Sequence, residues 1–160
     1  MRILALASLL LFCLACQSDP TNDWVEHDLM AQNLAVSVQG PDSVQIKSND
    51  LSGISRDVSL RNTDVGYYLQ IFSSLASTSD LARLKAEQLE LVRENPFFER
   101  IVQEDPSGFI FESRIDTVEH YGFRYVHYKG DREFIFQNGL GHIFSLEEIE
   151  RMYTAVDQGR

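Results

Sequence analysis

Short runs in which apolar and polar residues alternate occupy much of the chain between residues 34 and 137. Val44 and Ile46 alternate with polar neighbours, and the same period of two recurs at Val58 and Leu60. This alternation is typical of strands with one buried and one solvated face, and aromatic and β-branched residues favour strands further. We therefore predict strands at residues 34–38, 44–47, 57–61, 67–72, 100–103, 109–115, 123–128 and 133–137.

Two other segments place their apolar residues at helical spacing. Residues 79–94 carry Asp80 in the first turn, where a carboxylate favours the helix dipole, and Pro96 stops the helix. The second segment begins at Ser145 with Glu148 three residues later, which has the form of a capping box. Its apolar stripe consists of Leu146, Ile149, Met152, Tyr153 and Val156. We predict helices over 79–94 and 145–156.

Turn residues indicate how the predicted strands connect. Gly40-Pro41 predicts a hairpin between the first two strands, and residues 48–55 read as a loop. Lys129-Gly130-Asp131 predicts a hairpin near the end of the sheet, with glycine supplying a positive φ. Strands grouped together and covered by helices define an α+β fold. We predict an antiparallel β-sheet flanked by a long mid-chain helix and a C-terminal helix.

This architecture resembles the Mog1/PsbP-like α/β/α sandwich family, and cystatin-like or other antiparallel α+β folds remain alternatives. The resemblance lies in the early hairpin about Gly40-Pro41-Asp42, the helix at 79–94, the meander at 108–137 and the closing helix at 145–156. Members of that family act mostly as binding or assembly factors. The resemblance therefore favours binding over catalysis, without naming a ligand.

The first sixteen residues have the pattern of a secretory signal. Arg2 supplies positive charge, residues 3–12 are almost wholly apolar, and Ala15 is a small residue at the expected cleavage point. The run is shorter than the ~20 residues that span a bilayer. Cys16 directly after Ala15 resembles the lipobox of bacterial lipoproteins. An ordinary signal peptide, cut after Ala15 or further on and without lipid, is the alternative.

The lipobox resemblance implies that Cys16 becomes the mature N-terminus, with diacylglycerol on its sulfur and an acylated amine. Two or more acyl chains make membrane attachment stable. Gln17 stands where some bacteria place the Asp that retains lipoproteins in the inner membrane, so the expected address is the outer membrane, on its periplasmic or surface face. We predict a signal peptide at 1–15, a polar tether at 16–32 and one domain at 33–160.

Composition narrows the classes of partner. The chain carries 14 Lys and Arg against 24 Asp and Glu, a net charge of −10. Nucleic-acid binding requires many phosphates to be neutralised by basic residues, so we expect no nucleic-acid partner. The two cysteines are Cys13, which leaves with the signal, and Cys16, which takes the lipid. No thiol is then left for a disulfide, a metal cluster or a nucleophile.

Catalytic and metal-binding patterns are weak. The histidines, at positions 27, 120, 127 and 142, show no metal-ligand spacing such as i,i+4 on a helix. No serine lies in a Gly-x-Ser-x-Gly elbow, and a triad of Ser113, His127 and Asp116 is not favoured by spacing. We therefore predict no catalytic residues, no metal and no cofactor.

The aromatic residues carry the remaining functional hypothesis. Both faces of the predicted sheet are aromatic in places, and exposed aromatic residues mark binding surfaces. The candidate binding surface consists of Tyr121, Tyr125, His127 and Tyr128. The chain is expected to be a lipid-anchored, non-catalytic binding or assembly module of the bacterial envelope with a protein partner. A carrier of a small apolar ligand and an envelope hydrolase are the alternatives.

Overall fold

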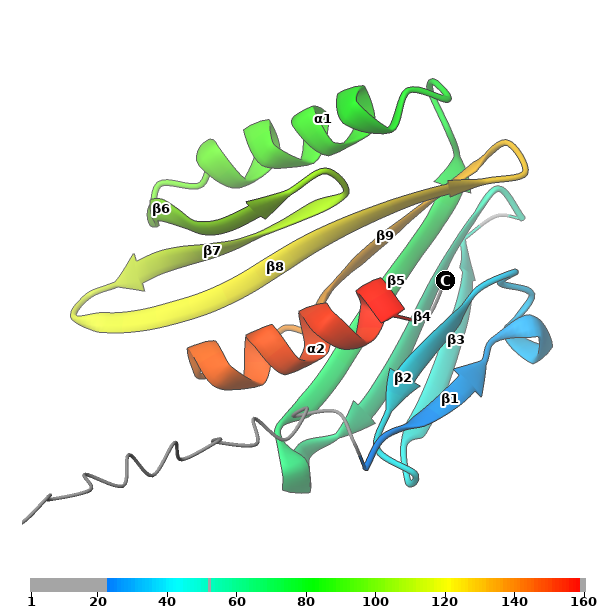
Figure 1. The fold of residues 1–160 in the computed structure, drawn as a ribbon, viewed down its shortest axis with the longest axis horizontal. Helices are drawn as coiled ribbons and strands as arrows, with labels where there is room; N and C mark the ends of the chain where they lie inside the picture. The colour runs from blue at the N-terminus through cyan, green and yellow to red at the C-terminus, as the bar shows by residue number, and fades with distance from the viewer. Residues whose placement is uncertain (1–22, 52, 159–160) are drawn as a thin grey trace, which may run out of the picture.

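The computed structural model describes residues 23–51 and 53–158, and in this part of the chain nine strands and two α-helices follow one another (Figure 1). The predicted signal peptide 1–15 and Cys16 lie outside the described residues. The first two strands, β1 (Val25–Asp28) and β2 (Ser37–Gly40), pair antiparallel as a small separate sheet. The 3-10 turn η1 (Met30–Gln32) lies between them.

The other strands form one antiparallel sheet of seven strands in the order β3-β4-β5-β9-β8-β7-β6. Two meanders build it, β3 to β5 and β6 to β9, and they join where β9 pairs with β5. The strands are β3 (Gln45–Leu51), β4 (Ser55–Asn62), β5 (Tyr67–Leu75), β6 (Phe98–Asp105), β7 (Gly108–Ile115), β8 (Val118–Lys129) and β9 (Arg132–Asn138). The prediction of an antiparallel sheet is confirmed.

The helices α1 (Leu81–Arg93) and α2 (Leu146–Gln158) cover opposite faces of this sheet. Phe123 packs edge-on against Tyr153 of α2, with ring centroids 5.8 Å apart. Arg124, the next residue of β8, lines a hollow together with Val92 of α1. Successive side chains of a strand point to opposite faces, so α1 and α2 lie on different sides. The predicted α+β fold with two flanking helices is confirmed.

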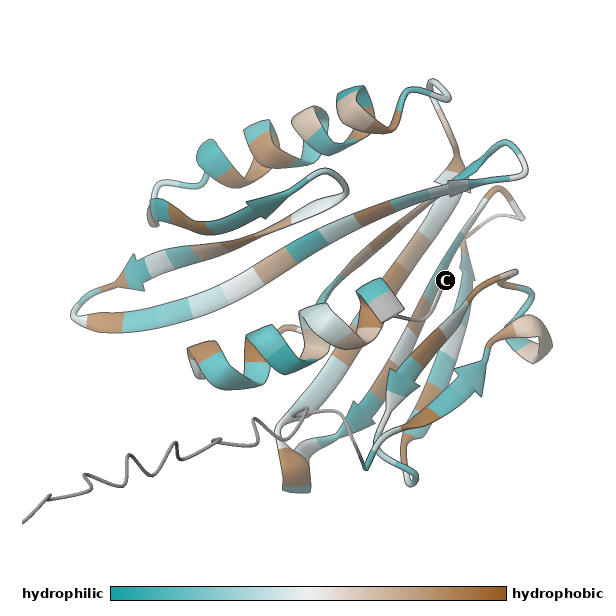
Figure 2. Cartoon of the chain, viewed as in Figure 1, coloured by the Kyte–Doolittle hydropathy of each residue, from teal (hydrophilic) through white to brown (hydrophobic). Residues whose placement is uncertain are grey.

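The hydrophobic core lies on the α2 face of the sheet. Figure 2 shows hydrophobic residues interspersed with hydrophilic ones along both helices, as expected of helices that bury one side. In Figure 1, α2 lies between β8 and the β1–β2 hairpin, so α2 and this hairpin cover the face side by side. The buried residues at its centre include Val58, Leu60, Leu69, Ile71, Ile110, Phe123, Phe134, Ile149 and Met152.

Helix α2 begins after Ser145 as predicted, whereas α1 begins at Leu81, two residues later than predicted, with Asp80 as its N-cap rather than in its first turn. The Asp80 carboxylate accepts hydrogen bonds from the backbone N–H groups of Ala82 (3.0 Å) and Arg83 (3.3 Å). At α2, the Ser145 N–H donates to the Glu148 carboxylate at 2.8 Å, and the Glu148 N–H donates to Ser145 Oγ at 3.3 Å. The capping box is thus confirmed, and it satisfies backbone donors that a helix start leaves unpaired.

The N-terminal part differs from the prediction. The expected hairpin about Gly40-Pro41 does not form, because β2 pairs with β1 while β3 pairs with β4. Residues 25–32, placed in the polar tether by the sequence, belong to the folded domain. Leu29 within this stretch is fully buried in the core. Strand β1 was not recognised in the sequence because most of its residues are polar, and an edge strand buries little of its own surface.

Aromatic contacts attach Trp24 to the rest of the domain. The Trp24 ring packs edge-on against Tyr67, with centroids 5.1 Å apart, and the Arg151 guanidinium of α2 lies 4.8 Å from the Trp24 ring centroid. Such cation–π contacts stabilise by ~0.5–2 kcal/mol. Trp24 therefore belongs to the folded domain. The predicted loop at 48–55 is also shorter, because β3 continues to Leu51.

Candidate functional site

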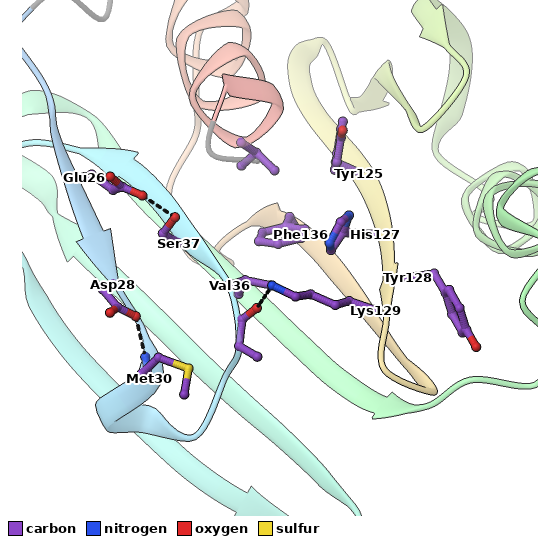
Figure 3. A pocket seen from close by; sticks show the side chains of 12 residues that line it. Glu26, Asp28, Met30, Val36, Ser37, Tyr125, His127, Tyr128, Lys129 and Phe136 are labelled. Carbon is purple, nitrogen blue, oxygen red and sulfur yellow. Dashed lines mark hydrogen bonds between the residues drawn. The ribbon is translucent and has the colours of Figure 1, made fainter.

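A cleft of about 610 Å³ opens between the β1–β2 hairpin and the β8–β9 hairpin (Figure 3). Small-molecule sites in proteins occupy ~300–1,000 Å³, so this volume suits a compact ligand. The C-terminal half of α2 closes one side through Val156. The cleft therefore lies where three separate parts of the chain meet.

The inner wall of the cleft is built by strand pairing. Tyr125 of β8 faces Phe136 of β9 in register, and their ring centroids are 6.1 Å apart. His127 follows two residues after Tyr125, so the period of two places it on the same face of β8. Val36, in the segment before β2, faces this wall from the other side. The wall is apolar at its base and carries polar groups towards the rim.

The opposite wall brings carboxylates to the rim. Glu26 and Asp28 alternate along β1 and are both exposed. The Ser37 hydroxyl donates to the Glu26 carboxylate, and Asp28 Oδ1 accepts from the Met30 N–H at 2.9 Å (Figure 3). These bonds hold the two carboxylates in fixed positions. A ligand in the cleft would meet apolar surface below and acidic groups above.

Lys129 crosses the cleft from the β8 side. Its Nζ donates to the backbone carbonyl of Ala35 at 3.0 Å, a contact between residues 94 positions apart in sequence (Figure 3). Lysine side chains bury their methylene stems along apolar surface while the ammonium stays polar. The Lys129 side chain therefore joins the two hairpins at one end of the cleft.

The structure brings together three of the four residues of the predicted binding surface. Tyr125, His127 and Tyr128 line the cleft. Tyr125 is buried, and its hydroxyl donates to Asp157 at 3.1 Å. In Figure 3 Tyr128 points away from the cleft centre, and its hydroxyl donates to Asp131 at 3.1 Å, a bond that raises the pKa of Tyr128.

Tyr121 lies apart from the other three residues. Its hydroxyl donates to Glu119 at 3.0 Å, and this hydrogen bond raises the pKa of Tyr121. It borders a different hollow, near the segment 139–144. The four residues share one strand, but β8 is 12 residues long. At ~3.3 Å per residue, its two ends are too far apart to serve one small ligand.

Sequence analysis missed the wall formed by Glu26, Asp28 and Met30, because these residues were placed in the tether. A signal was present, since Val25, His27 and Leu29 follow a period of two. His27 lies on the other side of β1 from the carboxylates, within 2.9 Å of the Pro41 carbonyl. The alternation was short and ended in polar residues, so it did not stand out from a linker.

The structure does not bring together the triad of Ser113, His127 and Asp116 that was weighed from the sequence. Ser113 of β7 pairs with His120 of β8, whereas His127 lies seven residues further along β8 and faces the α2 side. Within residues 23–51 and 53–158, no three His, Cys, Asp or Glu side chains form a group that could hold a metal ion. The same described stretches contain no helix that is both long and apolar enough to cross a membrane.

No protein-family model matches the chain, and no significant match was found among curated proteins or solved structures. Function is therefore inferred from the residues and their geometry. The cleft combines aromatic and aliphatic walls with hydrogen-bonded polar groups at its rim. This combination is typical of binding sites for small molecules.

Proposed function

We propose that this protein is a non-catalytic binding module of the bacterial cell envelope, anchored by lipid on Cys16, whose cleft holds a small amphipathic ligand. The observation that carries the proposal is the cleft of about 610 Å³ with Phe136 and Val36 at its base and Glu26 and Asp28 at its rim. Its aromatic walls, and a volume within the ~300–1,000 Å³ of small-molecule sites, support a role as a ligand carrier.

The apolar base of the cleft favours a ligand with a hydrocarbon part. Burying one CH₂ group stabilises a complex by ~0.8 kcal/mol, so a few methylenes against Phe136 and Val36 give useful affinity. The rim supplies hydrogen-bond acceptors in the Glu26 and Asp28 carboxylates. A ligand with an apolar body and a donor group at one end fits both parts.

The signal-like N-terminus supports the location. Ala15-Cys16 follows an apolar run and precedes a polar stretch, and two acyl chains give stable attachment. We place the domain at the outer membrane, on the periplasmic or the surface face. The likeness to Mog1/PsbP-like sandwiches belongs to the same proposal, since binding and assembly are the roles that this likeness implies.

A protein partner is the second candidate, and the edge strand β3 favours it. All seven residues of β3 are exposed, and its outer edge carries no neighbouring strand in the described part of the chain. A partner could add a strand there through backbone hydrogen bonds. The charged residues Lys47 and Asp50 on β3 limit unspecific pairing.

Membrane fractionation tests the anchor. We expect the Cys16→Ala variant to move from the membrane to the soluble envelope fraction, because the acyl chains supply the membrane affinity. The matched control is Cys13→Ala, which alters the other cysteine of the chain, and we expect it to stay with membranes. Retention of Cys16→Ala on membranes after salt and carbonate washes would contradict the proposed anchor.

Dye binding tests the cleft. The neutral probe N-phenyl-1-naphthylamine should fluoresce with the native domain, and Ala35→Trp should weaken its binding at least fivefold, since Ala35 lines the cleft. Ala31→Trp is the matched control, because Ala31 is also exposed and lies nearby in the chain but does not line the cleft. Equal loss in both variants, or no loss in either, would count against ligand binding at this place.

A further inference from the structure

Arg124 places a cation against the α1 face of the sheet, on the side away from the cleft. Its Nη1 donates to the Phe123 backbone carbonyl at 3.1 Å. Its guanidinium lies 5.8 Å from the Phe111 ring centroid, within cation–π range. These contacts hold the side chain in place and leave other guanidinium donors for further partners, because arginine has five N–H groups.

The charge of Arg124 has no acidic partner among the residues that the structure describes. The ion pairs found there involve Arg56, Arg83, Lys85, Arg100 and Arg114. Without a nearby carboxylate, burial lowers the pKa of the Arg124 guanidinium to about 10. It remains charged near neutral pH, and a partly buried charge without a partner carries a desolvation cost. An anion from outside would relieve that cost.

The nearest polar side chains do not neutralise Arg124. Gln137 faces Arg124 across the β8–β9 pair, but its Nε2 donates to Gln70 Oε1 at 3.1 Å. Gln70 Nε2 in turn donates to the Asp57 carboxylate at 3.1 and 3.2 Å. Asp57 sits on β4, three strands from β8, or about 14 Å at ~4.8 Å per strand. These hydrogen bonds therefore run from Gln137 through Gln70 to Asp57, away from Arg124, and bring no carboxylate to its guanidinium.

Arg124 borders two adjoining hollows of about 190 and 400 Å³, which also share Asn95, Phe111 and Gln137. We call these two hollows together the Arg124 groove. The Arg124 groove is lined by polar residues, such as His120 and His142, and by apolar residues that are exposed to solvent. Exposed fractions are 61% for Leu91, 47% for Phe97, 80% for Leu140 and 57% for Ile143. Clustered exposed apolar residues of this kind mark binding sites.

We propose that the Arg124 groove binds an amphipathic anion, a carboxylate or phosphate monoester that carries an apolar chain. The anionic head lies on the Arg124 guanidinium, whose planar fork matches both groups. The amides of Asn95 and Gln137 lie beside it, and the chain covers Phe97, Leu140 and Ile143. The site is independent of the cleft, since Arg124 and Tyr125 point to opposite faces of β8.

Isothermal titration with four ten-carbon probes tests the proposal: decanoate, decyl phosphate, decanol and decyltrimethylammonium. We expect the two anions to bind at least tenfold more tightly than the alcohol and the cation. Tighter binding of decanoate assigns the site to free carboxylates, and tighter binding of decyl phosphate assigns it to phosphate headgroups. Equal affinity for all four probes would overturn the proposal.

Variants locate the binding. Arg124→Met should weaken decanoate binding at least tenfold, whereas Arg83→Met, which removes the same charge from the exposed side of α1, should leave it unchanged. Leu140→Asp tests the chain contact without disturbing the core, because Leu140 is 80% exposed. It should weaken binding severalfold, and Leu75→Asp on β5, 62% exposed, is its control.

Unchanged affinity in both Arg124→Met and Leu140→Asp would place any anion binding elsewhere and overturn the proposal. Should Arg124→Met fail to fold, Arg124→Lys keeps the charge but loses the fork, and it should weaken decanoate binding severalfold. Loss of dye binding in Ala35→Trp with intact decanoate binding would separate the Arg124 groove from the cleft. The two sites can therefore fail independently.

Discussion

The two faces of the seven-stranded sheet are built differently. On the α2 face, side chains such as Phe123, Ile110 and Ile71 are fully buried. On the α1 face, Phe109 and Val126 are also fully buried, but Phe72 and Ile135 are only half-buried. A polar row of Arg124, Gln137 and Gln70 crosses the middle strands of this face. The same sheet thus carries the larger apolar core on one side, and a smaller buried cluster beside a partly open polar row on the other.

This difference separates stability from binding. Burial of apolar area is the main favourable contribution to folding, and most of the buried side chains belong to the α2 face. The α1 face contributes less, so it tolerates an unpaired cation and open apolar residues. We infer that changes in the core of the α2 face act mainly on folding, whereas changes in the polar row and the exposed apolar residues of the α1 face act mainly on ligand binding.

The sharpest test compares one phenylalanine from each face. Phe123→Ala should lower the free energy of unfolding by about 3–5 kcal/mol, because it empties a fully buried site against Tyr153. Phe72→Ala, at a half-buried position of the α1 face, should cost about 1–2 kcal/mol. Urea unfolding measures both values. Equal costs would show that the two faces contribute alike.

A smaller effect is expected from crowding the α2 face. In Gly108→Ala the new Cβ would lie 2.6 Å from the Arg124 carbonyl oxygen and 2.8 Å from the Tyr153 hydroxyl. Backbone cannot move aside easily, so we expect a loss of about 1–3 kcal/mol in thermal or urea unfolding. Ser59→Ala, on the α1 side of β4, is the control and should change stability by less than about 0.5 kcal/mol. An unchanged free energy of unfolding in Gly108→Ala would show that the core can accommodate the extra methyl group.

The pH dependence of stability tests Tyr67, another buried residue of the core. Burial raises the pKa of Tyr67 well above its usual 10, and its hydroxyl donates to the Gln39 carbonyl at 3.1 Å. The folded form keeps Tyr67 neutral, so its contribution is complete below pH ~10 and is lost as pH rises further. Tyr67→Phe should cost about 1 kcal/mol at pH 7. Its stability should also fall less between pH 10 and 11 than that of the wild type.

The smallest effect, with the opposite sign, is expected at Arg124. Replacing an unpaired, partly buried charge by an apolar residue of similar length is often neutral or stabilising. Arg124→Met should therefore leave the free energy of unfolding unchanged or raise it by up to about 1 kcal/mol. A loss greater than 1 kcal/mol would show that Arg124 serves the fold, and it would remove the contrast between the two faces.

Much of the fold could be predicted from local patterns. The alternation at Val58 and Leu60 predicted β4, and Ser145 with Glu148 predicted the start of α2, because these signals depend on neighbouring residues alone. The hairpin β8–β9 followed from Gly130 and Asp131, which both adopt positive φ (58° and 63°). Local sequence was sufficient where a strand pairs with the next strand along the chain.

The sites could not be predicted, because they depend on contacts between distant segments. The cleft forms because β1 lies opposite β8. Asp28 and His127 therefore line the same cleft although about a hundred residues separate them in sequence. Arg124 looked like an ordinary polar position in an alternating strand. Among the described residues it has no acidic partner, because the positions beside it on the neighbouring strands are Gln137 and Gln70. That arrangement follows from the strand order β5-β9-β8, which cannot be predicted from any one segment of the sequence.

The position of Trp24 limits how far the domain can travel. If Cys16 holds the lipid, seven residues lie between it and Trp24, and the eight Cα–Cα steps from Cys16 to Trp24 span at most about 28 Å. Such a short connection would keep the domain close to the headgroups. Any molecule that this domain captures would then have to come to the membrane surface.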